Sequence, residues 1–276
     1  MALNVQKVKW GHMLRAPAGF APTVRDRRSG TVADEVFAAW VLGPAAKIPK
    51  LSTRNGLQAV LFDLDGVLVD TAEFHYLAWK RLADDLSLPF NRHANHAFRG
   101  VSRMECLEKL LGTHARTFVD EEKTLLADRK NVYYLELVKT LTPRDLAPGA
   151  RGLAMGLRAL SEGGARLAVV SASRNARLVL NLLGITDWFD AIIDGTEVTR
   201  GKPDPQGFLL AAERLRVSPT HCIVIEDADA GLKAARNAGM KTVGIGGGVG
   251  ECDAHVNEIA ELTIDQLEHL IPESHD

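Results

Sequence analysis

A strand-like segment that ends in two acidic side chains is the feature that most restricts how this chain can fold. Residues 57–64 form a largely apolar run, with Asp63, Asp65 and Gly66 at its end. Side chains two positions apart on a strand face the same side, so Asp63 and Asp65 can share one centre. Neighbouring buried carboxylates repel unless a cation or proton neutralises them, and ligands of open α/β sheets bind at the carboxyl ends of strands. The segment therefore predicts a reactive site at a strand end, with a solvated Asp-Gly turn as the alternative.

The composition excludes several classes of protein. With 46% hydrophobic and 25% charged residues, the chain is typical of a soluble globular protein. Its net charge of −2 gives no basic field that would favour nucleic acid or an anionic membrane as a partner. The three cysteines show no C-x-x-C spacing, which suits a reducing compartment. No apolar stretch approaches the ~20 residues of a membrane span, and no secretory signal is recognisable, so we expect a cytoplasmic protein.

Residues 1–56 differ from the rest of the chain. They hold nine Lys/Arg and three Asp/Glu residues, a net charge of about +6, and prolines and glycines interrupt them. A short helix beginning near Thr31 would bring Phe37 and Trp40 to one face. This basic extension could be a transit peptide, a docking segment, or upstream sequence translated from a start assigned too early. Serine residues are too few for a typical transit peptide, so we favour the last interpretation.

From residue 57 onward, strand-like and helical patterns alternate, which predicts a parallel sheet with crossover helices. The expected strands are 57–64, 166–171, 189–193, 221–225 and 241–245, and the helices among them are 152–162, 175–183, 205–215 and 228–238. A nearly all-helical stretch lies between the first two strands, with helices over 73–86, 103–111 and 119–141. We therefore expect a doubly wound α/β core of residues 57–71 and 147–276, with a helical cap of residues 72–146 inserted into it.

Three further strand ends carry polar side chains. Residues 171–175 precede a helix, where hydroxyls and free N–H groups can bind an anion; a plain serine N-cap is the alternative. Lys202 precedes a helix that begins at a proline, and it is either a fixed cation of the site or a surface lysine. Glu226 and Asp227 follow the fourth strand, either as ligands for Mg²⁺ or as an exposed acidic turn. Together with Asp63, these groups would supply a nucleophile and the charges that neutralise a transferring phosphoryl group.

With these four motifs in this order, residues 57 to about 265 resemble the haloacid dehalogenase superfamily. The resemblance implies that Asp63 attacks phosphorus to form an aspartyl phosphate and that Asp65 is the general acid/base. It further implies that Ser171 and Lys202 hold the transferring phosphate. The Mg²⁺ ligands that it implies are Asp63, Asp65, Glu226 and Asp227. The helical insertion matches the C1 cap of the superfamily.

Segments of the cap and its edges resemble β-phosphoglucomutases more closely. These segments are 65–75, 78–80, 99–103, 129–131 and 171–175. In those enzymes the matching residues grip the phosphate that is not transferred, couple cap closure to the acid/base loop, or line the sugar site. The resemblance carries the first role to Arg103, Ser173, Arg174 and Asn175, the second to His75, and the third to Trp79 and Lys130. Lys80 and Ala172 lie within the same segments and are expected to bind substrate as well. Taken singly, each of the charged residues could be an ordinary surface residue.

The resemblance implies a β-phosphoglucomutase-like isomerase of carbohydrate metabolism, and we expect a monomer. It would interconvert β-D-glucose 1-phosphate and glucose 6-phosphate through β-glucose 1,6-bisphosphate, with a phosphoenzyme at Asp63 and with Mg²⁺ as cofactor. The alternative is a sugar-phosphate phosphatase, in which water hydrolyses the same aspartyl phosphate. Residues 202–205 follow the general phosphatase pattern. A non-catalytic binding protein of the same fold is disfavoured, because Asp63, Asp65, Lys202 and Asp227 are all present.

Overall fold

The computed structural model describes residues 56–160, 164–247 and 249–271. Apart from Gly56, the basic extension of residues 1–56 lies outside the described residues, and so do its expected helix and our interpretation of its origin. None of the described helices is both long enough and apolar enough to cross a membrane.

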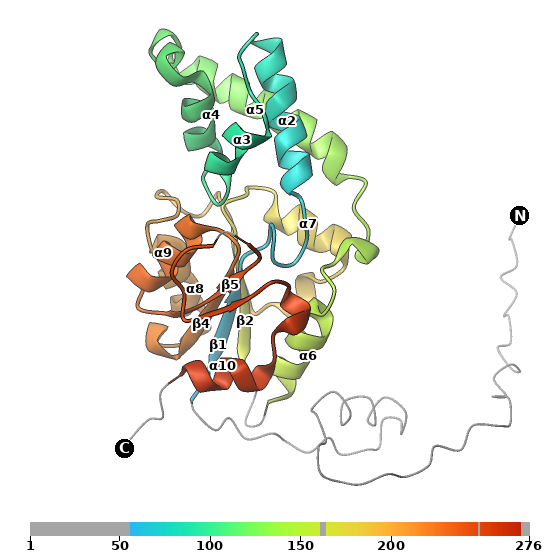
Figure 1. Ribbon diagram of the computed structural model, residues 1–276, viewed down its shortest axis with the longest axis vertical. Helices are drawn as coiled ribbons and strands as arrows, with labels where there is room; N and C mark the ends of the chain where they lie inside the picture. The colour runs from blue at the N-terminus through green and yellow to red at the C-terminus, as the bar shows by residue number, and fades with distance from the viewer. Residues whose placement is uncertain (1–55, 161–163, 248, 272–276) are drawn as a thin grey trace, which may run out of the picture. The chain divides into compact units, whose positions relative to one another are not determined.

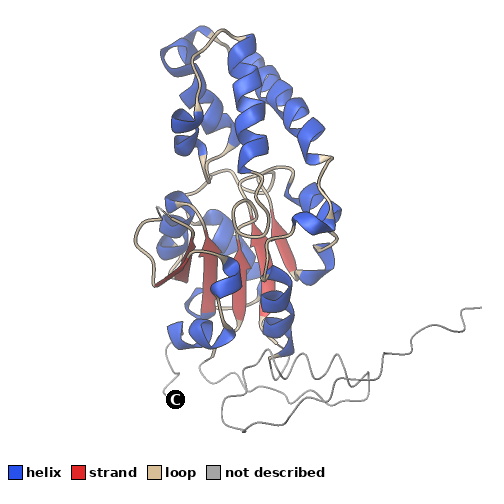
Figure 2. Ribbon diagram, turned by 45° about the vertical axis from the view of Figure 1, so that its right-hand side comes forward, coloured by secondary structure: helices blue, strands red, loops and turns tan. Residues whose placement is uncertain are grey.

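Six parallel strands form one sheet in the described part of the chain, in the order β3-β2-β1-β4-β5-β6 (Figures 1 and 2). The strands are β1 (Ala59–Phe62), β2 (Arg166–Val170), β3 (Ala191–Ile193), β4 (Cys222–Glu226), β5 (Lys241–Ile245) and β6 (Ala254–Val256). β1 lies between β2 and β4, and Phe62 pairs with Val169 on one side and Ile225 on the other. This register brings the carboxyl ends of three strands, and the loops that follow them, together at one edge.

The side chains of β1 alternate between two hydrophobic clusters. The helices around the sheet are α6 (Ala150–Ala159), α7 (Ala176–Leu183), α8 (Gln206–Leu215), α9 (Asp229–Asn237) and α10 (Ile264–Leu270). Val60 and Phe62 belong to the cluster that includes α6, α7 and α10, whereas Ala59 and Leu61 belong to the cluster that includes α8 and α9. The alternation follows from the period of two along a strand. Burial on both faces explains why residues 57–64 read as a nearly continuous apolar run.

The cap helices stand between β1 and β2 in the sequence and lie above the sheet in Figure 1. They are α2 (Ala72–Asp85), α3 (Arg92–Asn95), α4 (Arg103–Leu111) and α5 (Asp120–Val138). Many of their side chains, such as Trp79 and Leu107, form a hydrophobic cluster among these helices, whereas parts of α2 and α5 pack into the cluster that includes α6 and α7. α4 begins at a capping box in which Ser102 and Glu105 each bind the other's backbone N–H. The capping box therefore fixes the position of Arg103, the first residue of the helix.

The predicted α/β fold with an inserted helical cap is confirmed, although the ends of several elements differ by a few residues. β3 is shorter than predicted because its pairing with β2 begins only at Ala191, opposite Ala168; a 3₁₀ helix, Thr186–Trp188, lies before it. The other 3₁₀ helices of the described chain are His96–Phe98, Gly112–Thr117, Pro143–Asp145, Pro219–His221 and Ile259–Glu261. The sequence prediction missed α3, β6 and α10. β6 has only three residues, around an exposed His255, which is too short for a periodic pattern to be recognised.

Candidate active site

Asp63 lies directly after β1, at the carboxyl edge of the sheet. Its backbone N–H donates to the carbonyl of Ile225 at 2.9 Å, and the residue is only 5% exposed. The chain then turns at Gly66, whose φ of 92° is unfavourable for a residue with a Cβ. A Cβ at this position would also lie 2.1 Å from Oδ2 of Asp227. The turn after β1 therefore requires glycine, and it allows the Asp227 carboxylate to approach.

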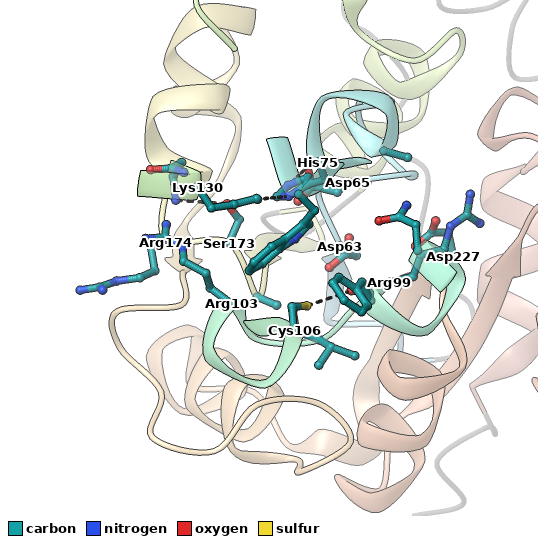
Figure 3. A pocket seen from close by; sticks show the side chains of 18 residues that line it. Asp63, Asp65, His75, Arg99, Arg103, Cys106, Lys130, Ser173, Arg174 and Asp227 are labelled. Carbon is teal, nitrogen blue, oxygen red and sulfur yellow. Dashed lines mark hydrogen bonds and ion pairs between the residues drawn. The ribbon is translucent and has the colours of Figure 1, made fainter. Parts of the chain in front are cut away.

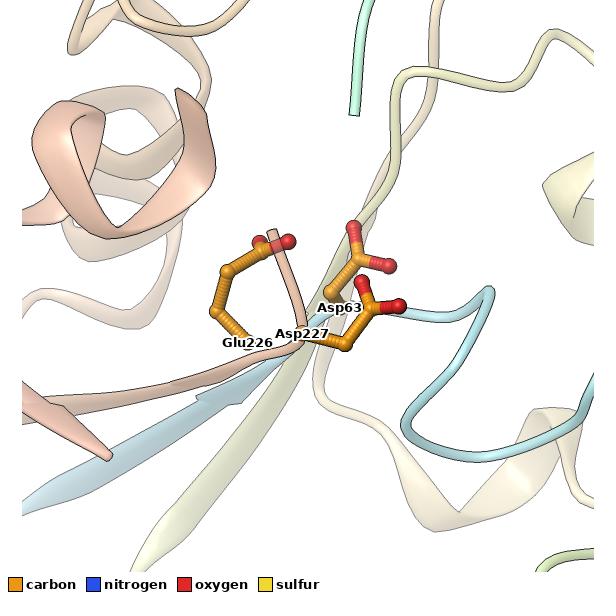
Figure 4. Close-up of side chains that lie close together, drawn as sticks. All are labelled: Asp63, Glu226 and Asp227. Carbon is orange, nitrogen blue, oxygen red and sulfur yellow. The ribbon is translucent and has the colours of Figure 1, made fainter. Parts of the chain in front are cut away.

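A cluster of three carboxylates surrounds the end of β1 (Figure 4). Oxygen atoms of Asp63, Glu226 and Asp227 all lie within 4.8 Å of one another. Burial and the negative charge of Asp63 raise the pKa of Glu226 to about 8 and the pKa of Asp227 to about 7. Such a cluster needs positive charge if all its members are to be ionised at neutral pH.

Lys202 supplies one positive charge to this cluster. Its Nζ lies 2.5 Å from Oδ1 of Asp63 and 2.7 Å from Oε2 of Glu226. It also donates to the carbonyl of Val170 at 3.2 Å. Burial opposes the charge of this ammonium, but the two carboxylates raise its pKa overall. Lys202 is therefore a fixed cation beside Asp63 and not a surface lysine.

The acidic cluster fits a Mg²⁺ ion. Its ligand atoms are all carboxylate oxygens, which Mg²⁺ prefers. Oε1 of Glu226 is buried and has no hydrogen-bond partner among the described residues, a costly state that a bound cation would relieve. Asp63, Glu226 and Asp227 would hold the ion. Asp65, which the sequence analysis included as a fourth ligand, is not part of this cluster.

Asp65 makes a separate set of contacts. The hydroxyl of Thr71 donates to its Oδ1, and Oγ of Ser171 lies 3.5 Å from its Oδ2. Burial and the charge of Asp63 raise the pKa of Asp65 to about 6. A carboxyl group with this pKa can both give and take a proton near neutral pH, as general acid/base catalysis requires.

Lys130 and His75 form a pair next to Asp65 (Figure 3). Nζ of Lys130 lies 3.0 Å from Nδ1 of His75 and 4.9 Å from the centroid of the Trp79 ring. Burial and the charge of Arg103 lower the pKa of Lys130 to about 7, and burial and Lys130 lower the pKa of His75 well below its usual value. His75 is therefore neutral. Its Nε2 lies 3.9 Å from Oδ1 of Asp65, so the pair connects cap helices α2 and α5 to that carboxyl group.

Two arginines lie at the other end of the pocket. Arg103 and Arg174 are near Ser173 and away from Asp63 (Figure 3). The Arg103 side chain is 14% exposed, and its ion pair with Asp128 is long, at 3.9 Å. Burial and the charge of Arg174 lower the pKa of Arg103. Two guanidinium groups with so little opposite charge form a site suited to an anion such as phosphate.

The loop before α7 lies at this end of the pocket and is held by its own hydrogen bonds. The backbone N–H of Ser173 donates to Oγ of Ser171 at 3.1 Å, and that of Asn175 donates to Oγ of Ser173 at 3.2 Å. Nδ2 of Asn175 donates to Oδ1 of Asn131 on α5 at 2.8 Å. Ala172 lines the pocket within the same loop. The hydroxyl oxygens of Ser171 and Ser173 thus accept hydrogen bonds from backbone N–H groups of the same loop, which fixes the conformation of residues 171–175.

One pocket, of about 100 Å³, brings most of the predicted site residues together. Those that line it are Asp63, Asp65, His75, Trp79, Arg103, Lys130, Ala172, Ser173, Arg174, Asn175 and Asp227. Ser171 and Lys202 line an adjoining cleft of about 630 Å³, and Glu226 is fully buried. Lys80 is not brought to the pocket. Its ammonium pairs with Asp84 instead, on an exposed part of α2.

The sequence analysis gave no role to Arg99, Phe98 and Cys106, which also line the pocket. Arg99 lies close to Asp227 in Figure 3, and its charge favours the ionised form of that carboxyl group. Its place in segment 99–103 was a signal that could have identified it. Phe98 contacts Trp79 edge-on, with ring centroids 5.5 Å apart. Nothing in the sequence marked Phe98, because its importance depends on how α2 packs against the 3₁₀ helix His96–Phe98.

The fold is that of a known enzyme family. The family model for haloacid dehalogenase-like hydrolases matches residues 57–239, and this chain therefore belongs to the haloacid dehalogenase-like hydrolase family. Within it, the chain is similar to a beta-phosphoglucomutase of Bacillus subtilis, with 44% identity over 215 residues that cover 76% of this chain and 94% of the relative. It is also similar to a phosphorylated carbohydrates phosphatase of Thermotoga maritima, with 30% identity over 190 residues that cover 68% and 84%, respectively. The crystal structure of a beta-phosphoglucomutase from Clostridium difficile superimposes with a TM-score of 0.73 at 37% identity, covering 78% of this chain and 97% of that one.

Proposed function

We propose that this protein is a phosphomutase that interconverts β-D-glucose 1-phosphate and glucose 6-phosphate through β-glucose 1,6-bisphosphate. One observation carries the proposal: Arg103 and Arg174 lie at the end of the pocket opposite Asp63. An enzyme that reorients a bisphosphate between two phosphoryl transfers must hold one phosphate while the other reacts. This arrangement offers two separate phosphate sites. The similarity to the Bacillus subtilis beta-phosphoglucomutase supports the same reaction.

In the first half-reaction, a carboxylate oxygen of Asp63 attacks phosphorus, and the bond between phosphorus and the sugar oxygen breaks. Asp65 gives its proton to the leaving sugar oxygen, which its raised pKa of about 6 favours. Lys202 and Ser171 stabilise the charge on the group in transfer. When bound, Mg²⁺ would supply further positive charge for the phosphoryl oxygens.

In the second half-reaction, a sugar hydroxyl gives its proton to Asp65 and its oxygen attacks the aspartyl phosphate. The bond between phosphorus and Asp63 breaks, so the carboxylate is restored. The bisphosphate must present either end in turn between the two half-reactions. Arg103 and Arg174 would hold whichever phosphate is not being transferred, as charge-assisted donors.

The cap has to open for this cycle. The reacting carboxylate of Asp63 is only 5% exposed, and Lys130 and Trp79 of the cap, which line the same pocket, are 3% and 2% exposed. A sugar bisphosphate therefore enters, turns and leaves only when the cap helices move away from the sheet. Closure then excludes water, which favours the sugar hydroxyl as the acceptor.

A sugar-phosphate phosphatase is the second candidate function. The relative from Thermotoga maritima is named as a phosphatase of phosphorylated carbohydrates, and the sequence of residues 202–205 follows the general phosphatase pattern. In a phosphatase, water would attack the aspartyl phosphate at Asp63, and the second phosphate site would be dispensable. The two functions therefore differ in their need for Arg103 and Arg174.

Product analysis distinguishes the two functions. The protein is incubated with β-D-glucose 1-phosphate, Mg²⁺ and a trace of β-glucose 1,6-bisphosphate, and glucose 6-phosphate and inorganic phosphate are measured in parallel. A mutase gives glucose 6-phosphate as the main product, with a rate that depends on the bisphosphate. If inorganic phosphate is the main product instead, the phosphatase assignment replaces the mutase assignment.

A further inference from the structure

The side-chain amide of Asn131 on α5 joins the cap to the core. Its Oδ1 accepts a hydrogen bond from Nη2 of Arg103 at 2.9 Å and another from Nδ2 of Asn175 at 2.8 Å. Arg103 begins cap helix α4, whereas Asn175 precedes α7 beside the sheet. Oδ1 of Asn131 thus accepts one hydrogen bond from the cap and one from the core. These two parts of the fold must separate when the pocket opens.

Both donors belong to the anion-binding end of the pocket. Arg103 and Asn175 line it, whereas Asn131 is not among its lining residues. A phosphate oxygen bound there would draw on the same guanidinium and amide groups that donate to Oδ1 of Asn131, and turning these groups toward the phosphate would lengthen their bonds to Asn131. The phosphate would prevail, because hydrogen bonds to an ionised acceptor are about twice as strong as those to a neutral one.

We propose that Asn131 is a positioning residue that holds Arg103 and Asn175 together and ties the cap to the core until the non-transferred phosphate of the substrate replaces its Oδ1. The tie itself depends only on the observed hydrogen bonds. The replacement step rests on the proposed function, because it requires a ligand that carries a second phosphate.

Hydrogen–deuterium exchange of the full-length, ligand-free protein tests the tie. Asn131→Ala removes the shared acceptor, and backbone exchange over residues 99–106 and 171–176 should become at least about threefold faster, with the central strands unchanged. Asn131→Asp keeps an acceptor of nearly the same shape and should restore slow exchange. Asn181→Ala, the same change at an exposed asparagine of α7, serves as the matched control. If backbone exchange in Asn131→Ala equals that in this control, the hydrogen bonds of Asn131 do not hold the cap to the core.

Binding of glucose 6-phosphate tests the replacement step. Calorimetry in an Asp63→Asn background, which prevents turnover, compares the same variants. Asn131→Asp should bind at least about tenfold more weakly, because its carboxylate keeps hold of Arg103 and repels the incoming phosphate. Asn131→Ala should stay within about threefold of the parent, because the phosphate itself supplies the missing acceptor.

The combined pattern is what a purely structural role would not produce. Asn131→Asp should restore the slow exchange and lose the binding, whereas a residue needed only for folding would lose or keep both together. Unchanged binding in Asn131→Asp would overturn the replacement step. If the parent protein forms no glucose 6-phosphate from β-D-glucose 1-phosphate but the exchange difference persists, the proposed function fails and the tie between cap and core stands.

Discussion

Nζ of Lys202 lies 2.5 Å from Oδ1 of Asp63, although 139 residues separate them in the sequence. The pair is buried, and Glu226 shares the ammonium at 2.7 Å. Because the cation has two partners, removing the charge of Asp63 leaves Lys202 paired. Chemistry and stability at this position are thus separable by mutation.

Asp63→Asn should abolish turnover and leave the fold intact. The amide cannot attack phosphorus, and Glu226 continues to neutralise Lys202. Steady-state rates, intact mass spectrometry for the phosphoenzyme, and circular dichroism are the measurements. Asp84→Asn, at an exposed position of α2, is the control. Turnover close to that of the unmodified protein would exclude Asp63 as the nucleophile.

Arg103→Ala should reduce mutase flux by at least ~100-fold, or about 3 kcal/mol of transition-state stabilisation. The reason is that the second phosphate is held in both half-reactions, whereas hydrolysis of the phosphoenzyme by water needs no such grip. Slow release of inorganic phosphate should therefore survive in the variant. Coupled assays for glucose 6-phosphate and phosphate measure both rates, with Arg116→Ala at an exposed cap position as the control. Intact glucose 6-phosphate formation would remove the main support for a mutase.

The two half-reactions should respond to pH in opposite directions. Burial and Asp63 raise the pKa of Asp65 to about 6, and transfer from the sugar to Asp63 needs the protonated form. Single-turnover formation of the phosphoenzyme should therefore slow as pH rises above about 6, whereas its discharge to a sugar hydroxyl, which needs the ionised form, should accelerate. Rapid-quench measurements between pH 5 and pH 8 report both. Parallel profiles for the two steps would contradict Asp65 as the group that carries the proton.

Mg²⁺ should stabilise the protein more at pH 8 than at pH 5. The pKa values of Glu226 and Asp227 are raised to about 8 and about 7 in the metal-free fold. At pH values between the pKa of each group in the unfolded protein and its raised pKa in the fold, the folded state binds more protons than the unfolded state. The free energy of unfolding therefore falls as pH rises through this range. A cation that binds the ionised carboxylates reverses this loss. Melting temperatures with Mg²⁺ and with EDTA measure the effect, and Asp227→Asn should diminish it; a Mg²⁺ effect independent of pH would argue against this cluster as the ligand set.

The strand ends were predictable from the sequence because each combines an apolar run with an abrupt polar residue. In a parallel sheet these ends meet at one edge, so the sequence alone predicts that Asp63, Ser171 and Glu226 lie near one another. Lys202 was harder to assign from the residues alone, since a lysine in a loop is usually solvated. Its depth depends on the path of the loop between β3 and α8, which no local pattern encodes.

The cap was less predictable than the core. Asn131 and Arg99 lie in segments that resemble β-phosphoglucomutases. The hydrogen bond of Asn131 with Asn175 and the electrostatic effect of Arg99 on Asp227 nevertheless depend on how the helices lie over the sheet. Lys80 was expected at the site because it lies next to Trp79 in the same segment. Successive positions of a helix face different directions, however, so the two side chains do not reach the same place. Trp79 therefore reaches the pocket, whereas Lys80 pairs with Asp84.

The separate hydrophobic cluster of the cap has a consequence for how such enzymes diversify. Because side chains such as Trp79 and Leu107 are buried mainly among the cap helices, substitutions that reshape the cap side of the pocket need not disturb the end of β1, where Asp63 and Asp65 lie. Substrates with different leaving groups and acceptors can then be accommodated during evolution, while the residues at the end of β1 stay the same. A chimaera that grafts a relative's cap onto this sheet would be the laboratory counterpart of that evolutionary route.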